Sequence, residues 1–208
     1  MKDLIIIGAR GWGREVLNAF RSNYSDEYHI KGFLDDNTKA LDGLKGDFPP
    51  ILSSVEDYEI QENDVFFCAL GEPKYRKKYA DIILAKGGEF ITYISPLARV
   101  NSNSTIGKGA FIGAYSFISD NVEVGDFTMI LDSCVLGHDA KIGSNVSIEA
   151  FCFFGGYSSV GDDSTIHVRS TIIRHKSVGQ NASVGACSLV IRHVKDNTSV
   201  FGSPATRI

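Results

Sequence analysis

A histidine and an aspartate stand side by side in the stretch LGHDAKIG, residues 136–143. An imidazole titrates near neutral pH, so histidine is the usual general base for taking a proton from an amine or a hydroxyl. A neighbouring carboxylate can orient the ring and stabilise the imidazolium that forms. His138 and Asp139 are therefore candidates for catalysis, although position alone favours a surface histidine beside a solvated aspartate.

The stretch around this pair belongs to a six-residue repeat. Every sixth residue from Val100 to Val190 is aliphatic or phenylalanine, without a slip in register. This period fits neither an α-helix nor a simple strand, and it predicts a parallel β-helix of short strands joined by tight corners. Three six-residue sides make a coil of about 18 residues, with the aliphatic residues inside and coils about 4.8 Å apart. His138, two residues past inward-facing Leu136, is expected at or near an outer corner.

Small residues and glycines accompany the repeat. A small residue usually stands two positions before the aliphatic one, where it fits a crowded inner corner, and glycine often follows directly. We attribute these glycines to backbone freedom near the turn. Cys134 and Cys152 lie 18 residues apart in a column of small residues, which explains them without redox or metal chemistry.

The first 95 residues predict a small α/β unit. Apolar runs at 4–8, 29–36, 64–71 and 89–94 are typical of strands, and helical stretches follow residue 13 and Pro73. The turn GARGWG (8–13) joins a strand to a helix start, which makes a phosphate-binding corner. Its spacing departs from the dinucleotide fingerprint, so a plain tight turn is the alternative. Asp35 and Asp36 end the second strand, where a carboxylate could reach a ribose or a base.

Composition bounds the class of protein. The 208 residues are 43% hydrophobic and carry a formal net charge of −4, which gives no reason to expect nucleic acid or an anionic membrane as partner. The N-terminal apolar run is too short for a signal peptide or a membrane span. Four widely spaced cysteines without a C-x-x-C motif favour reduced thiols. We therefore expect a cytoplasmic protein without membrane insertion, with domains at 1–95 and 96–208.

A zinc site is an alternative for the histidines of a β-helix. Here no H-x4-H motif occurs, and His138 and His175 are two coils plus one residue apart. That separation is about 10 Å, too far for one zinc ion within a subunit. We expect no metal.

The six-residue repeat resembles the left-handed parallel β-helix of hexapeptide-repeat acyltransferases, a family that packs the outer faces of this prism into trimers. GHDAKIG is similar to the H-[DE]-x-x-I-G stretch that carries the base in its bacterial sugar acetyltransferases. The resemblance maps His138 onto the base and Asp139 onto its acidic partner. GARGWGREVL, GFLDDN and CALGEPKYRKK resemble the N-terminal part of the group that N-acetylates nucleotide-linked 4-amino sugars, a plan shared by sialic acid O-acetyltransferases.

The resemblance also implies binding residues. Gly11, Trp12 and Gly13 would lie against the pyrophosphate, Asp35 and Asp36 near the nucleoside, and Gly71 beside the same cleft. Gly156 matches a position whose backbone N–H contacts acetyl-CoA, and Ser147 stands where some members have a CoA-contacting histidine. Many members have GHG where this chain has Gly11-Trp12-Gly13, which removes a polar group from the phosphate loop.

The implied activity is direct acetyl transfer, with acetyl-CoA as co-substrate and the amine of a UDP-, dTDP- or GDP-linked 4-amino-4,6-dideoxy sugar as acceptor. A homotrimer would perform it in the biosynthesis of a bacterial surface glycan or glycoprotein glycan. Two alternatives stay open. One is O-acetylation of sialic acid or another sugar, and the other is a non-catalytic trimeric scaffold that senses a nucleotide.

Overall fold

The structure, a computed structural model, describes all 208 residues, and they form two compact units, Met1–Ile91 and Thr92–Ile208. Neither helix of the chain is long and apolar enough to cross a bilayer.

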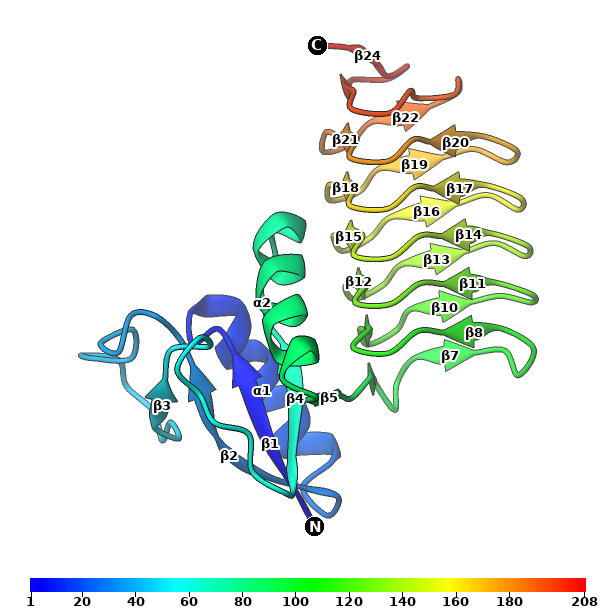
Figure 1. Cartoon of the computed structure of the whole chain (residues 1–208). Helices are drawn as coiled ribbons and strands as arrows, with labels where there is room; N and C mark the ends of the chain where they lie inside the picture. The colour runs from blue at the N-terminus through cyan, green and yellow to red at the C-terminus, as the bar shows by residue number, and fades with distance from the viewer. The chain divides into compact units, whose positions relative to one another are not determined.

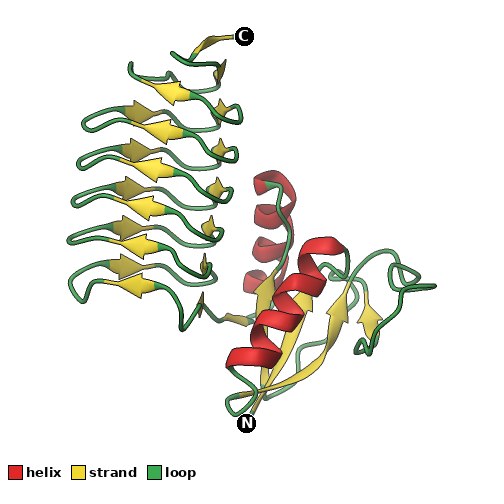
Figure 2. Ribbon diagram, turned by 180° about the vertical axis from the view of Figure 1, so that it is seen from behind, coloured by secondary structure: helices red, strands yellow, loops and turns green.

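The first unit is a parallel five-stranded sheet in the order β3-β2-β1-β4-β5. Its central strands are buried because their residues are apolar on both faces, as in the run Leu4–Ile7. Helix α1 packs on β1 and β2, and α2 packs on β4 (Figure 2). The elements are β1 (Lys2–Ile7), α1 (Gly11–Asn23), β2 (Tyr28–Leu34), β3 (Ile51–Ser53), β4 (Asp64–Cys68), α2 (Pro73–Ala85) and β5 (Glu89–Phe90).

The second unit is a column of stacked coils (Figure 1). Two-residue strands pair in parallel with the strand 18 residues further along, as Leu136 does with Phe154. The strands form three faces, which we call the first, second and third. The first face has β6 (Tyr93–Ile94), β9 (Phe111–Ile112), β12 (Met129–Ile130), β15 (Ser147–Ile148), β18 (Thr165–Ile166), β21 (Ser183–Val184), β23 (Ser199–Phe201) and the antiparallel β24 (Thr206–Arg207). The second has β7 (Arg99–Val100), β10 (Phe117–Ile118), β13 (Val135–Leu136), β16 (Phe153–Phe154), β19 (Thr171–Ile172) and β22 (Leu189–Val190). The third has β8 (Thr105–Ile106), β11 (Glu123–Val124), β14 (Lys141–Ile142), β17 (Ser159–Val160) and β20 (Ser177–Val178).

The six-residue register begins earlier than expected. The sequence predicted one strand over 89–94, but β5 pairs with β4 in the first unit, whereas β6 pairs with β9 in the second. Ile94 stands six residues before Val100 and packs against the core of the prism, so it already obeys the repeat. The short strand β3 was not predicted.

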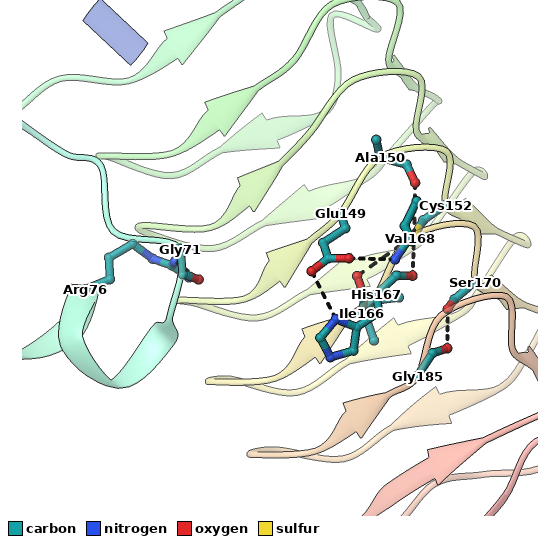
Figure 3. Close-up of polar contacts among 10 residues, drawn as sticks. All are labelled: Gly71, Arg76, Glu149, Ala150, Cys152, Ile166, His167, Val168, Ser170 and Gly185. Atoms are coloured by element: carbon teal, nitrogen blue, oxygen red, sulfur yellow. Dashed lines mark hydrogen bonds and ion pairs between the residues drawn. The ribbon is translucent and has the colours of Figure 1, made fainter. Parts of the chain in front are cut away.

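The inner column of small residues is confirmed. Cys134 and Cys152 are buried inside the prism, and each thiol lies against the carbonyl oxygen of the residue 15 positions later, at 3.2 Å. The hydroxyl of Ser170 donates to Gly185 O in the same pattern, at 2.9 Å (Figure 3). A small side chain with a donor therefore fits this corner and satisfies a backbone carbonyl.

The expected reason for the glycines was wrong. Glycines that follow an inward residue do not have a positive φ; the left-handed positions are two residues further on and hold other residues, such as Asp139 at φ 59°. A Cβ on Gly137 would lie 2.7 Å from the nitrogen of Gly156, and one on Gly155 only 2.4 Å from that of Arg174. These glycines are required because the next coil passes too close for a side chain.

Candidate active site

His138 and Asp139 lie on the corner between β13 and β14, where the chain turns from the second face to the third. The Nδ1 atom of His138 is 2.7 Å from Oδ2 of Asp139, and 56% of the imidazole side chain is exposed. Nδ1–H donates a hydrogen bond to the carboxylate, so Nε2 keeps its lone pair and has no protein partner. This tautomer is assigned from the hydrogen bond. The ring is thus oriented to accept a proton at Nε2.

Asp139 is itself held by the preceding coil. Asn121 Nδ2 donates to Asp139 Oδ1 at 2.7 Å, and the Asp139 N–H donates to the carbonyl of Asp120 at 2.9 Å. The hydrogen bond with His138, followed by that from Asn121, lowers the pKa of the Asp139 carboxyl below its ordinary value of 3.8. The carboxylate is therefore ionised wherever a neutral imidazole can act as base.

The following coil supplies the floor and one wall for the imidazole. A Cβ on Gly156 would lie 2.7 Å from His138 Nε2 and 2.8 Å from Cε1, so the ring occupies the space that glycine leaves. The edge of the aromatic ring of Tyr157 meets the His138 ring at a centroid distance of 5.1 Å and 90°. Tyr157 also stacks on His175, at 5.0 Å and 6°.

Other histidines make carboxylate pairs as well. His167 Nδ1 lies 3.0 Å from Glu149 Oε1, and the second oxygen of Glu149 accepts the N–H of Val168 at 2.8 Å (Figure 3). His29 pairs with Asp3 at 2.8 Å. A paired imidazole alone thus does not identify a base. No group of three or more His, Cys, Asp or Glu side chains is arranged to hold a metal ion.

The first unit carries a cleft of about 650 Å³, the size of a small-molecule site. It lies at the carboxyl ends of β1, β2 and β4, beside the start of α1, where the helix dipole favours anionic groups. Gly13 packs directly against the backbone of Gly8 in this corner. A Cβ at position 13 would overlap the carbonyl oxygen of Gly8, so only glycine fits there. The side chain of Arg76 is fully buried and donates to the carbonyl of Leu70 at 2.8 Å. It also donates to the carbonyl of Gly71 at 3.1 Å (Figure 3), and the two bonds fix the loop beside the cleft.

The two acids at the end of β2 have different surroundings. Asp35 accepts hydrogen bonds from the N–H groups of Ala9 and Asn37, each at 2.9 Å, so both of its oxygens are already bonded to the backbone. Asp36 accepts the hydroxyl of Tyr79 on α2 and keeps its second oxygen for a ligand. Both acids line the cleft. Asp36 is therefore the better placed to bind a ligand directly.

The sequence candidates fall into separate places. Trp12, Gly13, Asp35, Asp36 and Gly71 line one cleft, but Gly11 is not in its lining. His138, Asp139 and Gly156 meet at one corner of the prism. Ser147 is buried on β15 of the first face. Within a single chain it therefore lies away from the corner that holds His138.

Sequence reasoning missed several residues. Tyr157 packs against His138, Asn121 binds Asp139, and His175 stacks on Tyr157. Arg10, Tyr75 and Tyr79 line the cleft. Asn121 and Tyr157 stand 18 residues before and after Asp139, so the coil length could have found them. No sequence signal pointed to the tyrosines of α2.

Comparison with known proteins defines the class of fold. Residues 3–83 match the PglD N-terminal domain family, and residues 91–191 match the GMPPB C-terminal domain family. The chain has a Rossmann-like α/β unit followed by a left-handed parallel β-helix. The structure of PerB from Caulobacter crescentus, in complex with CoA and GDP-perosamine, has this fold, with a TM-score of 0.90 at 22% identity over 100% of this chain and 98% of that one.

Two curated proteins are similar in sequence. One is UDP-N-acetylbacillosamine N-acetyltransferase of Bacillus subtilis (strain 168), 31% identical over 118 residues, which cover 55% of this chain and 52% of that protein. The other is an uncharacterized protein of Acanthamoeba polyphaga mimivirus, 30% identical over 125 residues, 60% of this chain and 24% of that protein. The chain thus matches about half and about a quarter of the lengths of these relatives.

Proposed function

We propose that this chain is an acetyl-CoA-dependent N-acetyltransferase that acts on the amino group of a nucleotide-linked 4-amino-4,6-dideoxy sugar. The observation that carries the proposal is the His138–Asp139 pair, whose Nδ1–H bond leaves Nε2 free and exposed at a corner of the prism. The similarity to a B. subtilis UDP-N-acetylbacillosamine N-acetyltransferase and the fold shared with PerB support this substrate class.

The proposed chemistry is direct transfer. The sugar amine attacks the thioester carbonyl carbon, a C–N bond forms, and the C–S bond breaks. His138 Nε2 takes the proton that the nitrogen loses and returns it to the departing CoA sulfur, so the products are the amide and CoA thiol. Cys134 and Cys152 face the interior and are not nucleophiles in this scheme.

A backbone donor lies beside this base. The N–H of Gly156 has no protein acceptor, and the imidazole of His138 packs against the same residue. An N–H in that position suits the developing oxyanion or a carbonyl group of acetyl-CoA. We assign Gly156 this role. We propose that Ser147 contacts CoA only where the CoA is bound at the His138 corner of another copy of the chain.

The cleft of the first unit is proposed to hold the nucleotide. Trp12 and Gly13 at the start of α1 suit the pyrophosphate, since a helix N-terminus attracts phosphate. Gly11, the first residue of α1, is outside the lining of the cleft and would act only by keeping the helix start open. Asp36 suits a donor on the ribose or the base, and Gly71 borders the same space. The proposal leaves open whether the nucleotide is UDP, dTDP or GDP.

We further propose that the active form is a homotrimer. Outward side chains of the second face are mostly apolar, and Phe153 is 47% exposed. The corresponding positions of the third face are polar. An exposed apolar face beside the His138 corner favours a second copy as its cover. The outward residues of the second face are Arg99, Phe117, Val135, Phe153, Thr171 and Leu189, and those of the third face are Thr105, Glu123, Lys141, Ser159 and Ser177.

The proposal includes a cytoplasmic location and a role in making a bacterial surface glycan or glycoprotein glycan. All four cysteines are free thiols in the structure, which suits a reducing compartment.

The deciding experiment is an acceptor panel. The purified chain is incubated with acetyl-CoA and UDP-, dTDP- or GDP-linked 4-amino-4,6-dideoxy sugars, and with free sialic acid. CoA thiol release and the mass of the product are measured. We expect N-acetylation of one nucleotide-linked amino sugar. O-acetylation of sialic acid alone would replace this proposal by its enzymatic alternative, and binding of a nucleotide sugar without any turnover would favour the scaffold.

A further inference from the structure

The corner that holds His138 is clamped by the coils on either side of it. We propose that Asn121, in the coil before, and Tyr157, in the coil after, are positioning residues that fix the orientation and tautomer of the His138 imidazole. The kinetic part of this inference rests on the proposed function, whereas its structural part does not.

Asn121 acts through Asp139. Its amide donates to Oδ1 of Asp139 at 2.7 Å, while Oδ2 of the same carboxylate lies 2.7 Å from His138 Nδ1. With one donor on each oxygen, the carboxylate cannot turn about its Cβ–Cγ bond without losing a hydrogen bond. The line Asn121, Asp139, His138 thus resembles the orienting chain of a catalytic triad, in which each group fixes the next.

The same inter-coil bond occurs elsewhere without a histidine. Asn181 Nδ2 donates to Asn197 Oδ1 at 2.7 Å, and both Asn121 and Asn181 are exposed and have a positive φ, of 54° and 49°. The bond is therefore a general device for joining coils. What distinguishes Asn121 is its acceptor, the carboxylate that holds the imidazole.

Tyr157 acts on the ring directly. Its N–H donates to the carbonyl of His138 at 3.0 Å, its ring meets the imidazole edge-on, and His175 supports its other side. Gly156 forms the floor. With Asp139 at Nδ1, these contacts leave one orientation, in which the Nε2 edge of the ring lies over Gly156.

Asn121→Gly tests the first arm, and Asn181→Gly is its matched control. Glycine tolerates the left-handed φ at both positions, so both variants lose the same bond and gain the same backbone freedom. We expect Asn121→Gly to lower kcat about 10-fold, with KM for acetyl-CoA and acceptor changed less than about 2-fold. Asn181→Gly should keep wild-type kcat. Equal kcat values for the two variants would overturn the role of Asn121.

Tyr157 is tested by a pair of substitutions at one position. Tyr157→Phe keeps the ring, and Tyr157→Asn removes it but tolerates the φ of 59°. The phenylalanine variant also loses the weak hydrogen bond of the Tyr157 hydroxyl to Asp139, so we expect its kcat within about 2-fold of the wild type, and a loss of about 10-fold for the asparagine variant. Full activity of Tyr157→Asn would remove Tyr157 from the inference.

A spectroscopic measurement separates this inference from the proposed function. The ¹⁵N shifts of the His138 imidazole report its tautomer in the wild type, whether or not any acceptor is turned over. We expect the Nδ1–H form in the wild type and in Asn181→Gly, and a mixture of tautomers in Asn121→Gly and Tyr157→Asn. If these shifts change while no acceptor is acetylated, the positioning stands and the proposed function fails. If transfer occurs but the shifts of all variants match the wild type, the positioning fails alone.

Discussion

The imidazole of His138 lies in the space that a side chain at position 156 would occupy. A Cβ on Gly156 would come within 2.7–3.1 Å of three ring atoms, Nε2, Cε1 and Cδ2. The adjacent Gly155 faces backbone instead of a side chain. A Cβ on Gly155 would lie 2.4 Å from the backbone nitrogen of Arg174. One glycine makes room for a side chain, and the other makes room for a coil.

Gly156→Ala is therefore expected to change activity more than stability. The methyl group displaces a side chain that can rotate, so the melting temperature should stay within a few degrees of the wild type, while kcat falls at least about 10-fold. Gly155→Ala should instead lower the melting temperature, because backbone cannot move aside. Thermal denaturation and steady-state kinetics check both. A Gly156→Ala variant with normal kcat would show that the observed ring position is not needed for turnover.

Replacement of the proposed base should abolish most of the activity. We expect His138→Ala to lower kcat at least about 100-fold, because general base catalysis contributes about that much or more. The circular dichroism spectrum should be unchanged, since the side chain is more than half exposed. The matched control is His29→Ala, which breaks a histidine–aspartate pair of similar length in the first unit and should keep wild-type kcat. Wild-type-like turnover of the His138 variant would refute the assignment.

The repeat made much of the second unit predictable. A strict six-residue register specifies inward residues, coil length and corners together, so it placed His138 on a corner and the cysteines inside. The reason for the glycines was wrong because sequence shows where a coil turns, but not how closely the next coil passes it. The 18-residue column also relates Asn121 to Asp139, but only coordinates show that the amide reaches the carboxylate.

The first unit was predictable in its strands and less so in its site. Apolar runs and glycines located β1, β2, β4 and both helices. Asp35 and Asp36 are adjacent and alike in sequence, yet one holds backbone and the other accepts a tyrosine hydroxyl. That difference depends on where α2 lies against the sheet, which is a tertiary contact with no local pattern.

Asp139 should add no ionisation to the pH dependence of the reaction. Because hydrogen bonds from His138 and Asn121 hold the pKa of Asp139 below 3.8, this carboxylate stays charged over the range in which activity is measured. Any stability it contributes is present above its unfolded pKa and is lost as pH falls through its lower, folded pKa. Protonation of Asp139 therefore makes no contribution to the acid limb of kcat/KM.

Asp139→Asn provides the complementary measurement. Without the negative charge, the imidazolium that forms when His138 takes the proton is less stabilised, so kcat should fall over the whole pH range. An acid-side ionisation that is present in the wild type and absent from Asp139→Asn would contradict a carboxylate that stays charged over this range. Profiles between about pH 5 and pH 9 are sufficient, since they span the ordinary pKa of histidine.

A buried ion pair should make the first unit sensitive to acid. The side chain of Asp64 is fully buried and accepts hydrogen bonds from Lys31 Nζ at 2.6 Å, Tyr58 Oη at 2.7 Å and the Gln61 N–H at 2.8 Å. Burial alone would raise the pKa of Asp64, but the bonds from Lys31, Gln61 and Tyr58 outweigh it and lower the pKa below 3.8. The stability that this depressed pKa contributes is present above pH 4 to 5 and is lost as pH falls through the native pKa.

Asp64→Asn is expected to destabilise the first unit by about 2–3 kcal/mol, because the fully buried side chain at position 64 loses its charge-assisted hydrogen bond with Lys31, whose own side chain is 27% exposed. The single tryptophan, Trp12, lies in this unit, so its fluorescence during urea denaturation reports the change. The control Asp81→Asn, an exposed position on α2, should match the wild type. If both variants unfold at the same urea concentration, the ion pair does not stabilise the unit.

The apolar second face should hold the assembly together, because the third face lacks comparable side chains. Phe153 and Ser159 are both the first, outward residues of their strands, β16 and β17. Phe153→Glu places a charge on the proposed interface, where its desolvation opposes association. Sedimentation velocity should then show a monomer instead of a trimer, and kcat/KM should fall with it if two copies build each site. Ser159→Glu adds the same charge to the polar third face and should leave both the trimer and the activity intact. A trimer that persists in Phe153→Glu, or one lost in Ser159→Glu alone, would place the contact on a different face of the prism.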